Sequence, residues 1–308
     1  MAMSLRPLHP VFAAEATDVD LAHPITPAEV AAIHDAMDQY AVLVFPGQDI
    51  TDQQQIDFTR QLGPLENYPS GGHIRARTDS RLGAGISDFS NLDRNGNIIS
   101  DQDRIWFFKL GDRLWHSDSS FRPIPASYSL LSGRTLPSWG GNTDFADMRA
   151  AHDALDARTK AEVEDLVCRH SLRFSREAIG FTDLTPQEIE NFRPVRQRLV
   201  RTHPRTGRKS LFLSSHAGEI EGWTVPEARS FLRDLTEHAT QPRFVYSHAW
   251  RLHDLVIWDN ATTMHRARRF DRQEIRDMRR TTMAGDALTI EQECATGNRE
   301  IARVVGVG

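Results

Sequence analysis

The spacing of hydrophobic residues changes along the chain, and each spacing predicts a type of secondary structure. Where apolar side chains recur about every three to four positions, they share one face of a helix. Val30, Ile33 and Met37 have this spacing, and the segment 26–29, Thr-Pro-Ala-Glu, has the sequence of a capping box with proline in the first helical turn. We therefore predict a helix over residues 26–39. Similar start signals predict further helices that begin near Thr51, Thr185 and Thr224.

Short apolar runs bounded by turn residues predict strands. Some runs alternate hydrophobic and polar residues, as a half-buried strand does, and others are continuously apolar, as a fully buried strand is. These runs span residues 41–45, 126–132, 199–203, 210–214, 244–250, 255–258 and 279–284. Short strands together with helices predict an α+β protein whose sandwich or jelly-roll core is buttressed by the helices.

The whole chain of 308 residues is predicted to be a single domain, because no segment resembling an interdomain linker interrupts it. Residues 67–111 are rich in Gly, Ser, Asp and Asn, which predicts a long polar loop that acts as a lid or is a disordered insertion. Within it, Ile105, Trp106 and Phe107 are candidates for the wall of an aromatic pocket, with ordinary core packing as the alternative. The polar tail from about Thr289 predicts poor order or a contact between the subunits of a homo-oligomer.

Composition narrows the class of protein. The formal net charge of -5 gives no reason to expect nucleic-acid binding. Cys168 and Cys294 lack metal-type spacing, so we expect neither a thiolate zinc site nor a disulfide framework, and Cys168 is predicted to lie in the core. No apolar run approaches the length of a membrane span, and residues 1–10 lack the apolar segment of a signal peptide. These features favour a cytoplasmic protein.

Two histidines and a carboxylate are the main candidates for chemistry. His116 and Asp118 are one residue apart, so in an extended strand their side chains point to the same side and can bind one ion. His265 can supply a third ligand from far along the chain. Two imidazoles and a carboxylate fill one face of an octahedral metal and leave the other face open, an arrangement typical of non-haem iron(II) oxygenases. The motif alone is a weak signal, because a histidine satisfied within the core is the commoner case.

Two arginines beyond His265 strengthen the hypothesis. If residues 276–285 begin as a strand, Arg276, Met278 and Arg280 share one face. A guanidinium matches a carboxylate bidentately, so two of them on one face can hold two carboxylates near one metal. The alternative is a solvated basic stretch that pairs with nearby acids.

The order of these segments resembles the taurine and 2,4-dichlorophenoxyacetate dioxygenases, which use iron(II) and 2-oxoglutarate. The resemblance extends from about Leu8 to about Asp286 and is strongest to the 2,4-dichlorophenoxyacetate branch. The segments that carry it are 42–48 (VLVFPGQ), 62–66 (LGPLE), 115–121 (WHSDSSF), 140–151 (GGNTDFADMRAA) and 258–280. The resemblance implies a double-stranded β-helix core, the jelly roll.

The resemblance also implies roles for single residues. Arg276 and Thr143 take the positions that bind the distal carboxylate of 2-oxoglutarate, and Arg280 takes the position that binds the anionic group of the substrate. His216 is a further candidate for substrate binding, with a purely structural histidine as the equal alternative. Trp258 and Asn260 are expected to pack against the site and to brace its loop, without a catalytic role. The iron ligands that the resemblance implies are His116, Asp118 and His265.

The implied reaction is the hydroxylation of an aryloxyalkanoate next to its ether oxygen by O2. A phenol and glyoxylate would be released, and 2-oxoglutarate would be converted to succinate and CO2. Relatives that take phenoxyacetates use basic residues upstream of the His-X-Asp motif, whereas residues 68–106 contain no lysine here, which leaves the small anionic substrate open. The alternatives are a sulfonate or alkylsulfate substrate within the same family, or, from another class, a metal-binding barrel or a zinc hydrolase.

Overall fold

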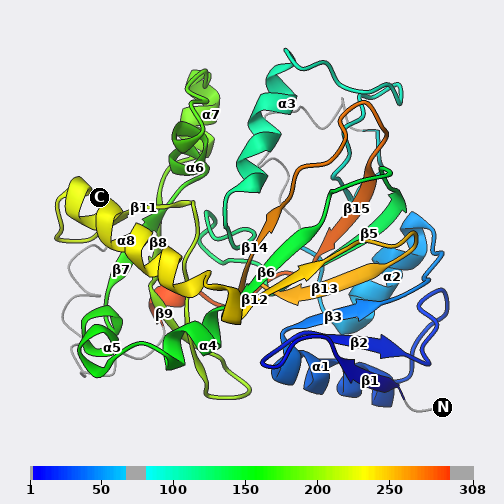
Figure 1. The fold of residues 1–308 in the computed structure, drawn as a ribbon, viewed down its shortest axis with the longest axis horizontal. Coiled ribbons are helices and arrows are strands. Elements are labelled where there is room, and N and C mark those ends of the chain that lie inside the picture. The colour runs from blue at the N-terminus through cyan, green and yellow to red at the C-terminus, as the bar shows by residue number, and fades with distance from the viewer. Residues whose placement is uncertain (1–2, 67–80, 292–308) are drawn as a thin grey trace.

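Two facing β-sheets form the centre of the protein (Figure 1). The computed structural model describes residues 3–66 and 81–291. The larger sheet has the strand order β1 (Ser4–Pro7), β2 (Ala14–Thr17), β3 (Val42–Phe45), β13 (Leu255–Asp259), β5 (Tyr128–Thr135), β15 (Asp277–Thr282) and β4 (Ser87–Asp88). The smaller sheet has the order β12 (Val245–His248), β6 (Thr143–Asp147) and β14 (Thr263–Ala267). All of these pairings are antiparallel except the one between β2 and β3.

The inner faces of the two sheets enclose an apolar core. Phe145 of β6 packs against Trp258 of β13, with their ring centroids 5.5 Å apart, and both side chains are fully buried. Because side chains alternate along a strand, the neighbouring Ala146 faces the opposite way and belongs to a different core. The fold is therefore the α+β jelly roll that the sequence predicted.

Helices α1 (Pro27–Tyr40) and α2 (Asp52–Leu62) cover the outer face of the larger sheet. Both begin with a capping box, in which a threonine and the residue three positions later satisfy each other's backbone N–H groups. Ile33 and Met37 of α1 and Phe58 of α2 pack on the outward side chains of the strands. The helices predicted near Thr26 and Thr51 are confirmed.

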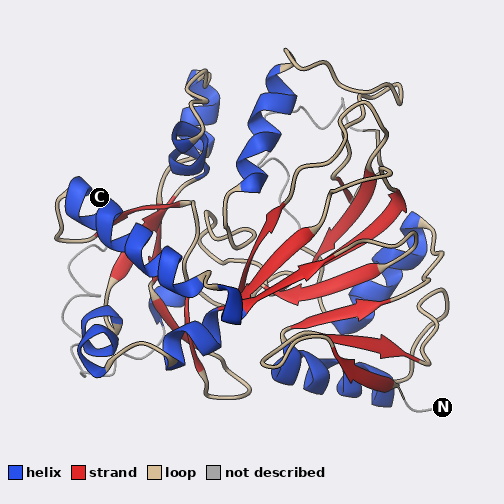
Figure 2. Ribbon diagram, viewed as in Figure 1, coloured by secondary structure: helices blue, strands red, loops and turns tan. Residues whose placement is uncertain are grey.

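A second region beside the sandwich contains most of the remaining helices (Figure 2). Its strands are β7 (Val167–His170), β8 (Val195–Arg198) and β11 (Ala217–Ile220) in one sheet, and β9 (Val200–Thr202) and β10 (Lys209–Leu211) in another. Its helices are α4 (Met148–Asp153), α5 (Ala157–Val163), α6 (Leu172–Ala178), α7 (Pro186–Asn191) and α8 (Val225–Ala239). Helices α4, α5 and α8 share a core with the outer face of β6 and the buried Cys168, whereas Leu172 of α6 lies in a separate core.

The predicted lid and the predicted C-terminal tail lie only partly within the described residues. Of the predicted lid at 67–111, residues 67–80 lie outside the described part, and 81–111 contain β4, helix α3 (Arg104–Lys109) and the start of a short 3-10 helix at Leu110–Arg113. Residues 292–308 of the predicted tail, including Cys294, are likewise outside the described part. Thr289 itself is buried and donates its hydroxyl to Oε1 of Gln197 at 2.6 Å, so the chain remains packed to this point.

Within the described residues, no helix is both long enough and apolar enough to cross a membrane.

Candidate active site

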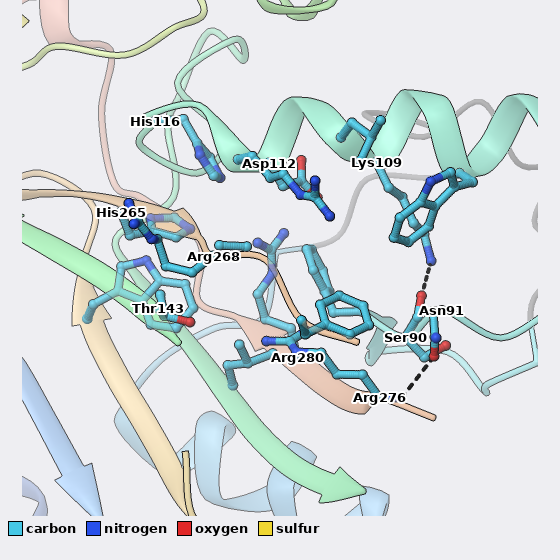
Figure 3. A pocket seen from close by; sticks show the side chains of 18 residues that line it. Ser90, Asn91, Lys109, Asp112, His116, Thr143, His265, Arg268, Arg276 and Arg280 are labelled. Carbon is cyan, nitrogen blue, oxygen red and sulfur yellow. Dashed lines mark hydrogen bonds between the residues drawn. The ribbon is translucent and has the colours of Figure 1, made fainter. Parts of the chain in front are cut away.

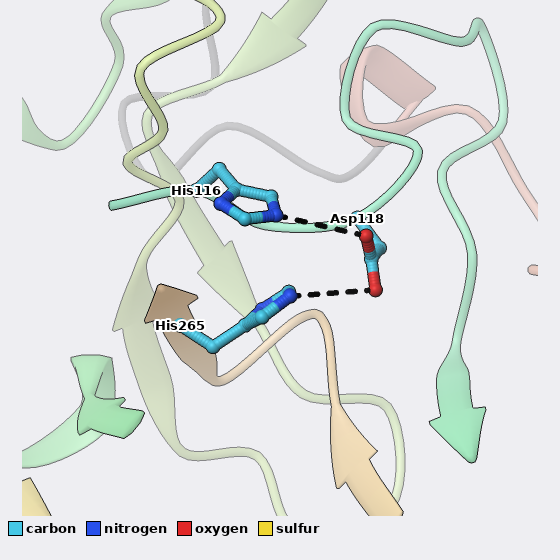
Figure 4. A group of neighbouring side chains, drawn as sticks. All are labelled: His116, Asp118 and His265. Carbon is cyan, nitrogen blue, oxygen red and sulfur yellow. Dashed lines mark ion pairs between the residues drawn. The ribbon is translucent and has the colours of Figure 1, made fainter. Parts of the chain in front are cut away.

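Three side chains from two distant segments of the chain, His116 and Asp118 from one and His265 of strand β14 from the other, meet in one place (Figure 4). Nε2 of His116 lies 3.9 Å from Oδ1 of Asp118, and Nε2 of His265 lies 3.7 Å from Oδ2 of the same carboxylate. All three residues are buried. Their candidate ligand atoms lie within 4.8 Å of one another, which is close enough to bind a single ion.

The backbone fixes the spacing of the two histidines. His116 and His265 face each other in an isolated antiparallel bridge. The N–H of His116 donates to the carbonyl of His265 at 2.9 Å, and the N–H of His265 donates back at 2.8 Å. The imidazoles are therefore brought together by reciprocal main-chain bonds as well as by any ion that they share.

The prediction that residues 116–118 form a strand is wrong beyond the bridge itself. The chain turns at Asp118, and Ser119 has a left-handed φ of 55°. Ser117 donates its hydroxyl to the carbonyl of Asn260 at 2.6 Å. This side-chain bond connects residues 116–118 to the loop before β14, where a continuous strand would have main-chain bonds. His116 and Asp118 still converge on one site, because the turn brings the carboxylate back towards the imidazole.

The hydrogen bonding of His116 and the protonation of His265 suit a metal. Nδ1 of His116 lies 2.8 Å from the carbonyl oxygen of Leu114, which can only accept a hydrogen bond, so Nδ1 carries a proton and Nε2 is the nitrogen that faces Asp118. Burial, followed by the proximity of His116, lowers the pKa of His265 well below its usual value, so this ring is neutral at physiological pH.

Asp118 is oriented by a chain of hydrogen bonds that has only one possible direction. The indole N–H of Trp258, which can only donate, donates to Oδ1 of Asn260 at 3.0 Å. The amide of Asn260 therefore presents its NH2 group to the hydroxyl of Ser129 at 3.0 Å. Ser129 in turn donates to Oδ2 of Asp118 at 2.8 Å. All four side chains are buried, so no bulk water competes with these bonds.

The carboxylate is ionised in this setting. Burial alone would raise the pKa of Asp118, but Arg280, His265 and His116 together with the Ser129 hydrogen bond lower it below its usual value. Two imidazoles and one carboxylate are a donor set that fits iron(II), so the chemistry of these three side chains fits a metal.

A cavity opens beside the two histidines (Figure 3). Its walls combine positive charge with apolar and aromatic surface. The basic side chains that line it are those of Lys109, Arg113, Arg268, Arg276 and Arg280. The aromatic and large apolar side chains are those of Phe89, Trp106, Leu110, Leu131, Trp258 and Phe270. Thr143 also lines it.

Arg276 is a buried cation in this cavity. Its Nη2 donates to the carbonyl of Gly141 at 3.3 Å, and its guanidinium lies 5.5 Å from the ring centroid of Phe270. Among the described residues no carboxylate forms an ion pair with it, and its Nε has no hydrogen-bond partner. Burial lowers the pKa of Arg276 to about 10, which still leaves it charged at neutral pH. A buried cation without a counter-ion is costly, so the site favours an anion.

Arg280 lies close to the triad. Its Nη1 donates to Oδ1 of Asp118 at 2.6 Å, and its guanidinium lies 4.0 Å from the ring centroid of Phe89. The sequence predicted that Arg276 and Arg280 share a face, and both do line the cavity. The direct bond to Asp118 was not foreseen. Because only part of the guanidinium is used by Asp118, its other N–H groups remain available to a ligand.

His216, the further candidate for substrate binding, lies outside the cavity and is not part of its lining. Its Nδ1 lies 2.9 Å from the hydroxyl of Ser175, and its ring packs between Phe121 and His116 at centroid distances of 5.1 and 5.8 Å. These contacts hold the ring behind His116, so the structural alternative fits its position better than substrate binding does.

Several residues of the site were missed by the sequence reasoning. Lys109 lines the cavity and donates to the carbonyl of Ser90 at 2.6 Å. It lies just beyond the lysine-free stretch at 68–106, so a longer window would have found it. Ser129 was also missed, and no sequence signal singles it out, because its role depends on Asn260 and Asp118 being brought next to it by the fold. Of the candidate aromatic wall, Trp106 does line the cavity, whereas Phe107 is exposed.

Comparisons with known proteins agree with this geometry. Residues 4–282 match the family described as "Taurine catabolism dioxygenase TauD, TfdA family". The chain is 43% identical, over 94% of its length and 100% of the relative, to an alpha-ketoglutarate-dependent 2,4-dichlorophenoxyacetate dioxygenase of Cupriavidus pinatubonensis. It is 38% identical to an (S)-phenoxypropionate/alpha-ketoglutarate-dioxygenase of Sphingobium herbicidovorans, over 92% of this chain and 96% of the relative. A crystal structure of AAD-2 in complex with Mn(II) and N-oxalylglycine is 56% identical, with a TM-score of 0.92 over 94% of this chain and 100% of that one.

Proposed function

The chain belongs to the TauD, TfdA family and is a 2-oxoglutarate-dependent dioxygenase, and from that premise we propose that it oxidises aryloxyalkanoates next to the ether oxygen. The observation that carries the proposal is the cavity, in which two arginines and an aromatic wall adjoin the His-Asp-His triad. Such a cavity suits two organic anions, of which one also has an aromatic ring.

His116, Asp118 and His265 are the proposed ligands of iron(II). When bound with 2-oxoglutarate, the iron supplies the activation of O2 that the hydroxylation needs. The chain's own contribution is to hold the ligand atoms ready. Its donors are Nε2 of His116, a neutral ring at His265 and a carboxylate whose direction is fixed through Ser129.

Arg276 and Thr143 are the proposed site for the distal carboxylate of 2-oxoglutarate. Both line the cavity, and Arg276 has no carboxylate partner among the described residues. A dianion that reaches from the triad to Arg276 would neutralise this cation. A guanidinium also favours a carboxylate over a neutral group because it can donate two parallel hydrogen bonds.

Arg280 is the proposed contact for the carboxylate of the primary substrate. Because Arg280 also bonds Asp118, an anion held by it lies next to the metal ligands. The carbon attached to that carboxylate is then the one presented for oxidation. In an aryloxyacetate this carbon also bears the ether oxygen, so its hydroxylation gives a hemiacetal that breaks down to a phenol and glyoxylate.

The aromatic wall accounts for the other end of the substrate. Phe89, Trp106 and Phe270 line the same cavity as Arg280 and offer ring faces and edges to an aryl group. Lys109 and Arg113 add positive charge at this wall. Among the described residues upstream of His116, they are the basic ones that line the cavity. They provide positive charge there although residues 68–106 contain no lysine.

The experiment that tests the proposal measures succinate formed by the iron(II)-loaded protein with 2-oxoglutarate in air. The compounds compared are phenoxyacetate, both enantiomers of 2-phenoxypropionate, taurine and an alkyl sulfate. We expect stimulation by an aryloxyalkanoate with an equal amount of phenol. Stimulation by taurine or the sulfate alone would overturn the substrate while keeping the enzyme class.

Substitutions of two neighbouring arginines in β15 separate the role of Arg280 in substrate binding from a general effect of lost positive charge. Arg280→Gln should raise the KM for the aryloxyalkanoate, with a smaller change in the KM for 2-oxoglutarate. Arg279→Gln is the matched control, because Arg279 is adjacent in β15 but pairs with Asp52 and Asp277 away from the cavity. Equal effects of the two substitutions would contradict the assignment of Arg280.

Two further expectations stay predictions from the sequence. One is that the protein forms a homo-oligomer, and the other is that it works in the cytoplasm. The native mass in solution and fractionation of cells test them.

A further inference from the structure

We propose that Trp250 is a positioning residue for 2-oxoglutarate, and that it acts by fixing the direction of the Thr143 hydroxyl. The inference deepens the proposed function and rests on its assignment of Thr143 and Arg276 to the distal carboxylate. Trp250 itself does not line the cavity, so it acts through Thr143 and touches no ligand.

A hydrogen bond joins Trp250 to Thr143. Nε1 of Trp250 donates to Oγ1 of Thr143 at 3.0 Å. A hydroxyl has one hydrogen to donate, whereas an indole N–H cannot accept. The hydroxyl hydrogen of Thr143 therefore cannot point at Trp250. Among the described residues this hydroxyl donates to no other group, which leaves its hydrogen for a ligand in the cavity that Thr143 lines.

The fold holds the indole in the position that this role needs. In the pairing of β12 with β6, His248 lies directly opposite Thr143, so the chain leaves β12 next to the threonine and reaches Trp250 just afterwards. The ring of Trp250 packs edge-on against His248 at a centroid distance of 4.8 Å. Nε2 of His248 lies 3.1 Å from the carboxylate of Asp254, and both of these side chains are buried. The indole thus has little freedom to turn away from Thr143.

The acceptor that this arrangement anticipates is a carboxylate. Thr143 and Arg276 line the same cavity, and the buried guanidinium supplies the positive charge for the same anion. If Trp250 did not donate, the Thr143 hydroxyl could rotate among its staggered positions, and part of the time its lone pairs would face the anion. Trp250 excludes one of these positions before 2-oxoglutarate arrives, so the hydrogen faces the anion more of the time and less orientational freedom is lost on binding.

The test measures binding to the Mn(II)-loaded protein by calorimetry, with 2-oxoglutarate and with 2-oxobutyrate, which has the 2-oxo acid group but no distal carboxylate. Trp250→Phe should raise the Kd of 2-oxoglutarate about threefold to tenfold, the range of one neutral hydrogen bond, and should leave 2-oxobutyrate and Mn(II) binding unchanged. Thr143→Val should raise it more than about tenfold. The double variant should bind no more weakly than Thr143→Val alone, because Trp250 acts only through that hydroxyl.

Trp223→Phe is the matched control for the loss of an indole, because Trp223 packs against Phe231 in the core that contains Cys168 and does not line the cavity. A second route keeps the packing of the site intact. Benzothienylalanine at position 250 has sulfur in place of the N–H and nearly the same shape, and it should reproduce the effect of Trp250→Phe on the Kd.

The outcomes distinguish this inference from the proposed function. If Thr143→Val weakens 2-oxoglutarate but neither replacement of Trp250 does, the positioning role is overturned and the carboxylate site stands. If Trp250→Phe and Thr143→Val weaken 2-oxoglutarate additively, Trp250 acts by another route and the inference is also overturned. If neither Thr143→Val nor Arg276→Gln affects 2-oxoglutarate, the proposed carboxylate site itself is wrong.

Discussion

Replacing Ser129 by alanine should weaken metal binding by a calculable amount. Ser129 donates to Oδ2 of Asp118 at 2.8 Å, and it is the last member of the chain that begins at Trp258 and passes through Asn260. A hydrogen bond to a charged acceptor contributes about 1.5–3 kcal/mol. Without it the carboxylate can rotate away from the two histidines. A tenfold change in a dissociation constant corresponds to about 1.4 kcal/mol. We therefore expect the Kd for Mn(II) to rise roughly 10- to 100-fold, which is also the usual effect of losing a group that orients a metal ligand.

The same substitution should also lower stability, and this effect must be separated from the first. Ser129→Ala leaves the NH2 group of Asn260 without its acceptor, which costs about 1–3 kcal/mol in the free energy of unfolding whether or not metal is bound. Ser132→Ala is the matched control. Ser132 is buried on the same strand and donates to Oε1 of Gln55 at 2.7 Å, away from the triad.

The assay pairs a metal titration with urea denaturation of the metal-free proteins. Both variants should lose comparable stability, and only Ser129→Ala should lose metal affinity. A Ser129→Ala protein that binds Mn(II) as tightly as the wild type, at the stability of Ser132→Ala, would refute the argument that the hydrogen-bond chain orients the ligand.

Three further predictions concern charge and protonation. Arg276→Gln should raise the Kd of 2-oxoglutarate at least tenfold in calorimetry, because a lost charged hydrogen bond is worth about 1.5–3 kcal/mol, and it should leave Mn(II) affinity unchanged. Arg280→Gln should change Mn(II) affinity measurably even without substrate, since it removes the cation bonded to Asp118, and an unchanged affinity would argue against that bond. Burial lowers the pKa of His170 from 6.5 to about 3, so between these values the unfolded chain takes up a proton that the folded protein does not. The free energy of unfolding should therefore fall with decreasing pH, by up to about 1.4 kcal/mol per unit, and His170→Phe should flatten this decline between pH 7 and pH 5 in urea denaturation.

The sequence predicted those parts of the fold that depend on local signals. The helix after Thr26 was predicted because its capping box and its apolar spacing act within a few residues, and the structure places it at Pro27–Tyr40. Strand β13 was predicted from its apolar run for the same reason. Strand β6 was missed, because its sequence TDFAD mixes two aspartates with apolar residues and becomes buried only through pairing with β12 and β14.

The residues of the site also fall into those that the sequence predicted and those whose contacts it did not predict. The triad and the arginines at 276 and 280 were identified from motif order, and the structure brings them together around one cavity. The contact between Arg280 and Asp118 could not be predicted, because it depends on how β15 lies relative to a turn far away in the sequence. The two alternatives for His216 stayed open for a related reason. Its short distance from His116 is real, but a sequence does not tell on which side of a ligand a neighbour packs.

The reciprocal backbone bonds between His116 and His265 bear on how the protein acquires its iron. They join main-chain groups and not the imidazole nitrogens, so the chain's own hydrogen bonds contribute to the separation of the two rings and the ion need not supply all of it. Iron then stabilises the native state by mass action, in proportion to the logarithm of its free concentration over its Kd. We therefore expect removal of the metal to lower the free energy of unfolding without unfolding the protein, in contrast to small zinc domains that unfold when the metal is removed.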